Sequence, residues 1–177
     1  MKKYFLITPL IVFFCIILVF FYFLIIKRDP SHIPSALIEK KTPKFEAPSL
    51  FNEKNFISNK EFGNETVVVN FFSSWCVPCR AEHQYLKILS NEKKIKIIGI
   101  NYKDDSKEAI KWLSELGNPY SNIAIDLNGH IAIDWGVYGI PESFIINKNN
   151  IIQYRQVGPI TKKTYKDFYS KIIESLK

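Results

Sequence analysis

Two cysteines separated by two residues, Cys76 and Cys79, constrain the fold of this chain more than any other feature. They follow residues 66–72, a run dominated by valine and phenylalanine that predicts a buried strand. A helix that begins at Cys76 directs its free N–H groups and its positive dipole end at that sulfur, which stabilises a thiolate. Pro78 fits the first turn of such a helix, where its missing N–H would have no partner. The pattern therefore predicts a dithiol at a strand-to-helix junction.

A zinc site and a structural disulfide are the alternatives for this pair. Zinc needs about four ligands, and Cys15 and the three histidines offer no second pair at metal spacing. A crosslink across two residues closes too short a loop to stabilise the fold much. We therefore expect a Cys76–Cys79 disulfide that opens and closes by thiol exchange, with no metal and no cofactor.

The second strong feature is an apolar segment near the N-terminus. Residues 4–26 carry no charged side chain, and as a helix they would span roughly 35 Å, against about 30 Å for a hydrocarbon core. A cleaved signal peptide has a shorter apolar core and a small-residue cleavage site, whereas Lys27 and Arg28 follow here. We expect an uncleaved signal anchor over residues 4–26, after a cytoplasmic N-terminus of residues 1–3.

Charge alone leaves the orientation of this anchor open, because Lys2 and Lys3 nearly balance Lys27 and Arg28. Disulfide exchange is sustained outside the cytosol, which favours a single-pass protein of a bacterial inner membrane with its catalytic domain in the periplasm. Most of the basic excess behind the net charge of +7 lies in the first 45 residues, where anionic headgroups account for it. The charge therefore gives no reason to expect a nucleic-acid partner.

After a proline-containing linker over residues 27–45, residues 46–177 have the length of one domain. Hydrophobic periodicity predicts alternating strands and helices followed by a hairpin and a last helix. The expected strands cover residues 66–73, 95–100, 143–147 and 151–156, and the expected helices cover residues 77–90, 106–116 and 165–176. This order predicts an α/β sandwich with a mixed sheet.

A Trp-Cys-x-x-Cys motif after the first core strand, with Pro141 ahead of a hairpin, resembles the thioredoxin fold, a central mixed β-sheet flanked by helices. More narrowly, the chain resembles the membrane-anchored thiol:disulfide interchange proteins of cytochrome c biogenesis, the CcmG/DsbE family. The similar segments are residues 34–38, 79–86, 101–105, 115–120 and 136–144. Val77 between the cysteines and Ser73-Ser74 before the tryptophan depart from the family pattern, which leaves the redox potential open.

The position of the pair suggests a role for each cysteine. Cys76, ahead of the helix, is expected to be the exposed nucleophile, and Cys79, one turn in, the more buried resolving thiol. Trp75 is expected to pack beside the sulfurs and to limit the access of water, the alternative being a plain core residue.

Four further site residues follow from the resemblance. It implies a cis peptide bond between Ile140 and Pro141 that faces the cysteines, so that Ile140 offers backbone groups to an extended substrate. It also places Glu82 and Glu142 in an acidic neighbourhood, where a carboxylate could accept the Cys79 proton or oppose thiolate formation. An ordinary trans-proline and, for Glu82, a solvated glutamate at the start of the helix are the alternatives.

The resemblance implies a membrane-tethered reductant without a cofactor. Its electrons would come from a transmembrane thiol-disulfide donor and pass to apocytochrome c or to a Cys-x-x-Cys protein of the haem-attachment machinery. Two other functions stay open at this point. One is a general extracytoplasmic disulfide oxidant, and the other is a redox-silent docking or chaperone module.

Overall fold

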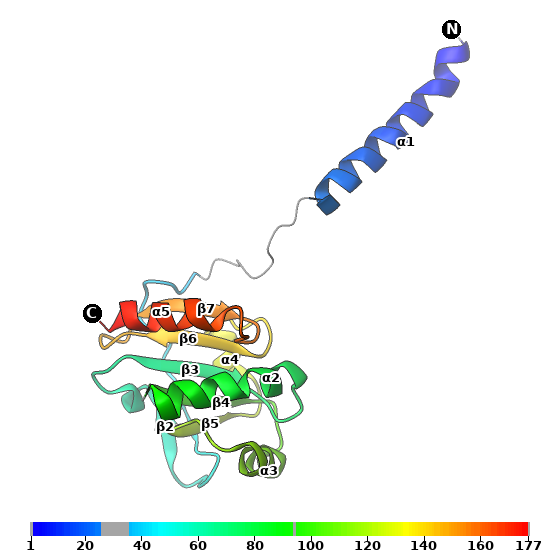
Figure 1. Cartoon of the computed structure of the whole chain (residues 1–177). Coiled ribbons are helices and arrows are strands. Elements are labelled where there is room, and N and C mark those ends of the chain that lie inside the picture. The colour runs from blue at the N-terminus through cyan, green and yellow to red at the C-terminus, as the bar shows by residue number, and fades with distance from the viewer. Residues whose placement is uncertain (1, 26–35, 94, 177) are drawn as a thin grey trace. The chain divides into compact units, whose positions relative to one another are not determined.

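The computed structural model describes residues 2–25, 36–93 and 95–176. Contacts divide the chain into a unit of residues 1–32 and a unit of residues 33–177. In the first unit, α1 (Lys2–Ile25) is a continuous helix (Figure 1). Within the described ranges it is the helix long and apolar enough to cross a membrane: residues 7–25 have a mean hydropathy of 2.8, and none of them is buried. Residue 26 and residues 27–35 of the expected linker lie outside the described residues.

The second unit is built on a mixed sheet. Among the described residues, five strands are arranged in the order β5-β4-β3-β6-β7. Their bounds are β3 Val67–Phe72, β4 Lys96–Tyr102, β5 Asn122–Asp126, β6 Glu142–Ile146 and β7 Ile152–Val157. The central strand β3 runs parallel to β4, and β4 runs parallel to β5, while β6 is antiparallel to both β3 and β7. The carboxyl ends of the parallel strands β3, β4 and β5 therefore lie at the same edge of the sheet, where the cysteine pair follows β3.

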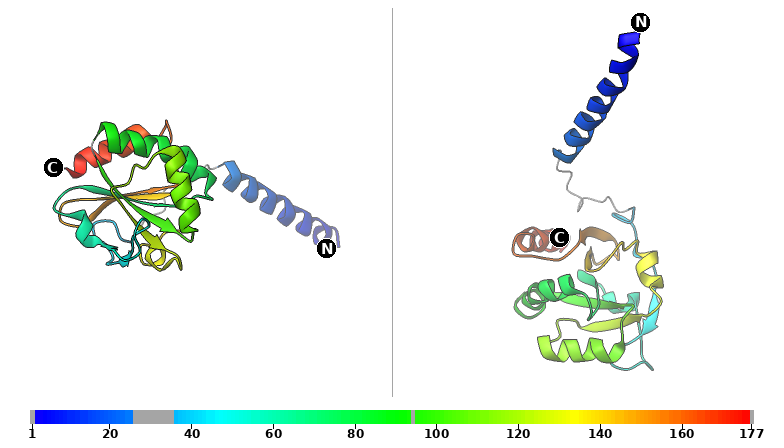
Figure 2. Two further views of the ribbon diagram at one scale, coloured as in Figure 1. Left: turned by 90° about the horizontal axis from the view of Figure 1, so that it is seen from below. Right: turned by 90° about the vertical axis from the view of Figure 1, so that its right-hand side faces the viewer.

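Helices cover the two faces of the sheet unequally (Figure 2). One face is covered by α2 (Val77–Lys87), α3 (Ser106–Leu116) and α5 (Tyr165–Ser175), whose buried Leu86, Trp112 and Phe168 share one core cluster. The other face carries the short helix α4 (His130–Asp134) and the 3-10 helix η1 (Asn59–Phe62), with Trp135 and Phe62 in a second cluster. Because side chains alternate along a strand, β3 supplies both clusters.

The residues before the sheet form a strap, which we define as residues 36–50. Leu37, Ile38 and Phe45 pack on the second cluster, Lys41 bridges to Ile151, and Ser49 bridges to Ala124. The strap contains β1 (Glu46–Pro48), which pairs antiparallel with β2 (Phe56–Ser58). The last ten residues of the expected linker, residues 36–45, thus pack against the domain, because their apolar side chains contact the second cluster.

The expected thioredoxin-like architecture is confirmed, with small shifts in its elements. The helix expected over residues 77–90 ends as an α-helix at Lys87 and continues as the π-helical turn η2 (Ile88–Glu92). The helix over residues 106–116 has the predicted bounds. Sequence periodicity missed β5, α4 and the β1–β2 hairpin, because segments of three to five residues show too little of either period.

Candidate active site

The cysteine pair lies where β3 passes into α2. Cys76 is the N-cap residue of α2, with φ −84° and ψ 107°, and the Cys79 N–H donates to Cys76 Sγ at 3.1 Å. The two residues form a disulfide with an S–S distance of 2.06 Å. A helix N-terminus leaves its first N–H groups without helical partners, and here one of them is directed at the first sulfur. This geometry stabilises negative charge on Cys76 once the disulfide is reduced.

The expected difference in exposure between the two cysteines is wrong for this disulfide form. Cys76 is 3% exposed and Cys79 is 1% exposed, so both belong to the core. The sulfur of Cys76 is covered on one side by the loop before β6, because the Ile140 carbonyl oxygen lies 3.7 Å from it. The cysteines therefore differ in their hydrogen bonds and in their place on the helix, and not in exposure.

Asp104 holds the turn that leads into the pair. Its carboxylate accepts the Ser74 N–H at 2.6 Å, the Ser74 hydroxyl at 2.8 Å and the Asn101 amide at 2.9 Å. Asp104 is 5% exposed and follows β4, so it connects the carboxyl ends of the two neighbouring strands. Sequence reasoning quoted Asp104 only as part of a family segment, although an acidic residue after a buried strand was a usable signal.

Trp75 lies on the surface. Its side chain is 58% exposed, and the indole N–H donates to the Lys103 carbonyl at 3.1 Å. A plain core role is therefore wrong for Trp75. The bond to Lys103 holds an aromatic ring at the rim of the site, next in sequence to the nucleophile candidate.

The peptide bond between Ile140 and Pro141 is cis, the isomer that the resemblance implies. Pro141 precedes β6, which pairs with β3, so the loop before it is brought to the carboxyl end of the central strand. Ile140 is half-buried and packs on both core clusters. The structure thus brings Ile140 and Cys76 together from positions 64 residues apart.

Glu82 belongs to a buried polar network beneath α2. Its Oε1 accepts from the Asn70 amide at 2.8 Å, and its Oε2 accepts from the Ile160 N–H at 2.9 Å. The Asn70 amide also donates to Ser143 Oγ at 3.0 Å and accepts from the Tyr120 hydroxyl at 2.8 Å. Sequence reasoning missed Asn70, Tyr120 and Ser143, although a lone asparagine inside an apolar strand was a signal for a buried polar contact.

The carboxyl of Glu82 is 1% exposed, so the alternative of a solvated glutamate is wrong. Burial raises the pKa of Glu82 from its usual 4.5 to about 7, against the opposing effect of the Ile160 and Asn70 hydrogen bonds. Burial, and then the charge of Glu82, also raise the pKa of the Tyr120 hydroxyl well above its usual value. At neutral pH Glu82 is therefore poised between its two protonation states.

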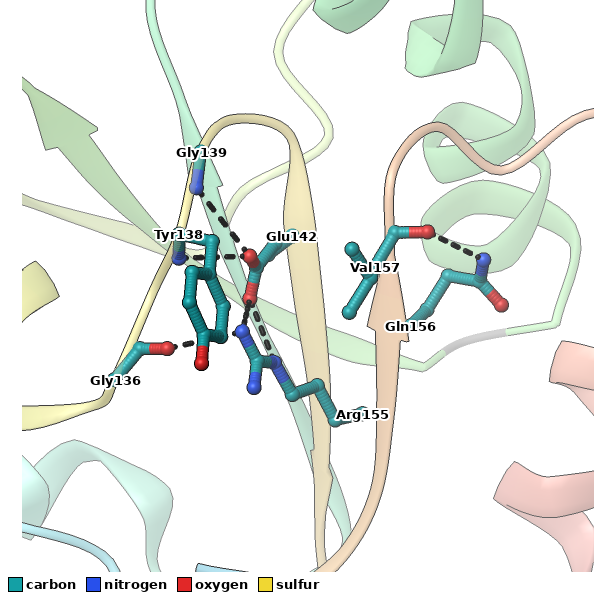
Figure 3. A network of polar contacts seen from close by, with 7 residues as sticks. All are labelled: Gly136, Tyr138, Gly139, Glu142, Arg155, Gln156 and Val157. Carbon is teal, nitrogen blue, oxygen red and sulfur yellow. Dashed lines mark hydrogen bonds and ion pairs between the residues drawn. The ribbon is translucent and has the colours of Figure 1, made fainter. Parts of the chain in front are cut away.

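Glu142 is equally buried, but its surroundings are different (Figure 3). Its Oε1 accepts the N–H groups of Tyr138 at 3.0 Å and Gly139 at 3.4 Å. Its Oε2 accepts from Arg155 Nε and Nη2, both at 2.7 Å. Four donors thus surround the two carboxyl oxygens of Glu142, two from the loop backbone and two from the Arg155 guanidinium. Sequence reasoning missed Arg155, because a single arginine in a strand is usually solvated.

A helix N-terminal disulfide after a central strand, beside a cis-proline loop, defines a thioredoxin-fold dithiol oxidoreductase. The model of the Redoxin family matches residues 38–172. The thiol:disulfide interchange protein DsbE of Escherichia coli (strain K12) is 42% identical over 171 residues, covering 94% of this chain and 92% of the relative. The thiol:disulfide interchange protein CycY of Rhizobium leguminosarum bv. viciae is 43% identical over 140 residues, covering 79% and 75%. The chain therefore belongs to the DsbE/CcmG proteins of the Redoxin family, which are thiol-disulfide oxidoreductases.

Solved structures agree with the fold. A secreted thiol-disulfide isomerase from Corynebacterium glutamicum superposes with a TM-score of 0.69 at 22% identity, covering 82% of this chain and 95% of that one. A thioredoxin-family thiol:disulfide interchange protein from Chlorobium tepidum TLS gives 0.66 at 19% identity, covering 82% and 100%. At these identities the likeness establishes the thioredoxin-like architecture alone.

Proposed function

We propose that this oxidoreductase is a membrane-anchored reductant of extracytoplasmic cytochrome c maturation. It would receive electrons from a transmembrane thiol-disulfide donor and pass them to apocytochrome c or to a Cys-x-x-Cys maturation protein, as the family resemblance implies. The observation that carries the chemistry is the placement of Cys76 Sγ, which accepts a helix N–H and lies 3.7 Å from the Ile140 carbonyl oxygen. A nucleophile is thus set beside backbone that can pair with an extended substrate.

The reaction is two successive thiol-disulfide exchanges. The Cys76 thiolate attacks one sulfur of the substrate disulfide, a mixed disulfide forms, and the first substrate sulfur leaves as a thiolate. Cys79 then loses its proton and attacks Cys76 Sγ, which releases the second substrate thiolate. Two electrons pass to the substrate, and the enzyme ends as the Cys76–Cys79 disulfide seen here.

Glu82 is proposed as the acceptor of the Cys79 proton. The two residues are three positions apart on α2, so they project from the same side of the helix, and both are buried. Because burial raises the pKa of Glu82 to about 7, its carboxylate is basic enough to accept a proton at neutral pH. Glu142 is less suited to this task, because each of its oxygens already has two donors.

The anchor is proposed to be residues 4–26, with residues 1–3 in the cytoplasm and the folded unit in the periplasm. The support is α1, a continuous apolar helix of sufficient length. A tether raises the effective concentration of the redox pair near membrane-bound partners. Reporter fusions after Lys44 test the orientation: an exported phosphatase should be active there and a cytoplasmic reporter inactive. The reverse result would place the domain in the cytoplasm.

Trapping of mixed disulfides with Cys79→Ser tests the partners directly. Without the resolving thiol, the bond between Cys76 and the substrate persists, so that covalently bound proteins can be identified by mass spectrometry. Recovery of apocytochrome c or a Cys-x-x-Cys maturation protein supports the proposal. Recovery restricted to unrelated secreted proteins contradicts it. Cys76→Ala is the control variant, because it removes the attacking sulfur.

Two measurements separate the reductant from its alternatives. We expect a reduction potential well below that of the strong oxidant DsbA, roughly −120 mV. A value near that of DsbA would reverse the direction of electron flow and favour a general oxidant. Cytochrome c maturation that continues with Cys76→Ala would instead favour a redox-silent docking or chaperone module.

A further inference from the structure

A hollow of about 450 Å³ lies between α2, the π-helical turn η2 and the end of α3. Arg80, His83 and Lys87 line it from α2, and Leu116 lines it from the last turn of α3. None of the described residues that line this hollow is acidic. Two cations therefore share a hollow in which no carboxylate of the wall balances their charge.

The guanidinium of Arg80 is available to a ligand. Arg80 is exposed, and in the part of the chain that the structure describes its side chain forms no hydrogen bond or ion pair. Lys87 Nζ donates to the Leu116 carbonyl at 2.8 Å, which leaves two of its three N–H groups for a ligand. Because Arg80 directly follows Cys79, a ligand in the hollow lies beside any protein that docks over the cysteine pair.

His83 contributes a hydrogen-bond acceptor to the same hollow. Its Nε2 lies 2.7 Å from the Gly117 carbonyl oxygen, which can only accept, so Nε2 carries the proton. Burial lowers the pKa of His83 against the effect of this bond, and the charges of Lys87 and Arg80 lower it further, so that Nδ1 is an unprotonated acceptor at pH 7. His83 is 3% exposed, and Nδ1 has no hydrogen-bond partner among the described residues. A buried acceptor of this kind requires a donor, and the hollow that His83 lines gives a donor access.

The spacing of these groups fits a peptide better than one small anion. Arg80 and Lys87 are seven residues apart on α2, which is about 10 Å along a helix and equals about three residues of extended chain. Two carboxylates at that separation can each meet one cation, while a backbone N–H between them supplies the donor for His83. The side-chain amides of Gln84 and Asn91 also line the hollow, and each can donate to and accept from a peptide backbone.

We propose that this hollow binds an acidic segment of a protein that exchanges disulfides with Cys76. Arg80 and Lys87 bind carboxylates of the segment, and His83 Nδ1 accepts one of its backbone N–H groups. The hollow thereby contributes to the choice of partner, apart from the sulfur chemistry. This inference uses only the thiol-disulfide exchange of the family and does not depend on a role in cytochrome c maturation.

Exchange between the reduced full-length protein in detergent micelles and oxidised Cys-x-x-Cys peptides tests the site. One peptide carries two glutamates three residues apart beside the disulfide, and a matched peptide carries glutamines in their place. Both are made with the pair on the N-terminal side and on the C-terminal side of the disulfide. The preference is the half-saturating concentration of the glutamine peptide divided by that of the glutamate peptide for the same protein. An effect of a substitution on the cysteines themselves cancels in this ratio.

The variants are Arg80→Gln, Lys87→Gln and the double variant. Lys111→Gln is the matched control, because it removes the same charge from an exposed position of α3 that does not line the hollow. Lys87 also bonds to the end of α3, so melting curves accompany its variants. Arg80→Gln changes an exposed side chain without such a bond, and it decides the result if the Lys87 variants unfold.

We expect the wild type to prefer the glutamate peptide about tenfold, because each partly exposed ion pair contributes a factor of about three. Each single variant should retain about threefold preference, the double variant none, and Lys111→Gln the full preference. No preference in the wild type, or the same loss in Lys111→Gln as in Arg80→Gln, would overturn the proposal.

Nitrogen NMR of the His83 ring tests where the segment binds. A glutamate peptide without cysteines should shift the Nδ1 resonance, and inorganic phosphate at the same concentration should not displace the peptide. An unchanged Nδ1 resonance at saturation would contradict the assigned site, and displacement by phosphate would show a site for small anions instead of a peptide. Failure of the cytochrome role would appear in the trapped partners and would leave these results unchanged.

Discussion

At the scale of single residues, the site is organised by polar groups placed inside the core. Asn70 interrupts an apolar strand, and its side-chain amide donates to Glu82. The Tyr120 hydroxyl donates to the Asn70 amide oxygen and so fixes the orientation of the amide. Gly99 leaves room for this arrangement, because a Cβ there would lie 3.1 Å from the Tyr120 ring and 2.9 Å from Phe72. The buried acid is thus held by partners from several elements, which keeps it near the pair despite the unfavourable loss of hydration.

Substitution Glu82→Gln is expected to change how stability depends on pH. The pKa of Glu82 is about 7 in the folded protein and 4.5 when exposed, so the folded state binds more protons between these values. Its contribution to the free energy of unfolding therefore falls as pH rises through this window, by about 3 kcal/mol in total. Urea unfolding of the oxidised protein from pH 4 to pH 8 measures it. The free energy of unfolding of the wild type minus that of the variant should fall as pH rises. A difference that stays constant with pH would contradict the raised pKa of Glu82.

Selective alkylation is expected at Cys76 in the reduced protein. The Cys79 N–H bonds to Cys76 Sγ, and the N-terminus of α2 stabilises negative charge on a sulfur at its N-cap. Iodoacetamide at pH 7 followed by peptide mapping should find the label mainly on Cys76. Because both sulfurs are buried in the disulfide, this preference depends on charge stabilisation. Equal labelling of the two cysteines would contradict the assigned roles, and preferential labelling of Cys79 would reverse them.

At the scale of elements, the loop between α4 and β6 depends on how α4 ends. Gly136 follows the helix with φ +63°, and the bonds from Gly136 to Ile133 and from Val137 to Ala132 form a Schellman motif. Glycine adopts this left-handed conformation without strain, whereas a residue with a Cβ does not. The direction in which the loop leaves α4 towards the active site is therefore set by one glycine.

Replacement of Gly136 by alanine should lower the free energy of unfolding by about 1 kcal/mol, because of its left-handed backbone. A Cβ at Gly136 would meet nothing within 4 Å, so the loss is conformational and not steric. Gly139→Ala is the matched control: it has equal space in the same loop and no positive φ. Urea denaturation compares the two variants. Equal losses would show that the left-handed backbone is not the cause.

Sequence patterns predicted those elements whose periodicity is long enough to recognise. The valine and phenylalanine run predicted β3, and apolar residues at helical spacing predicted α2, α3 and α5. The Arg155–Glu142 pair could not be predicted in this way. Its two residues are neighbours only because β6 and β7 pair with Phe144 opposite Arg155, and a strand arginine normally faces solvent. Burial of Glu82 was equally hidden, since a glutamate near the start of a helix is usually solvated.

At the scale of the whole molecule, residues 36–45 belong to the folded unit, although the sequence predicted that the domain begins at residue 46. The strap buries Leu37, Ile38 and Phe45 against the second cluster, and Phe45 contacts the rings of Phe62 and Trp135. Pro43 and the lysines Lys40 and Lys41 predicted a solvated linker over these residues, and the apolar residues between them were too few to show a period.

A chain that begins at Ala36 should therefore be more stable than one that begins at Glu46. The shorter chain lacks three partly buried apolar side chains, worth about 3 kcal/mol together at about 1 kcal/mol each. Thermal melts of the two oxidised proteins, monitored by circular dichroism, measure the difference. Identical melting temperatures would mean that the strap packs without stabilising the domain.

The strap also affects how copies of the chain behave beside one another. It contributes backbone at both outer strands of the sheet, through Lys41 with Ile151 next to β7 and through Ser49 with Ala124 on β5. Open strand edges are templates on which neighbouring molecules aggregate. Proteins anchored in one membrane are confined to a plane, where collisions are frequent and are not reduced by dilution. By pairing with part of each outer strand, the strap leaves less open edge for a neighbouring copy, so that under the proposed anchoring crowding would favour sheet-to-sheet polymerisation less.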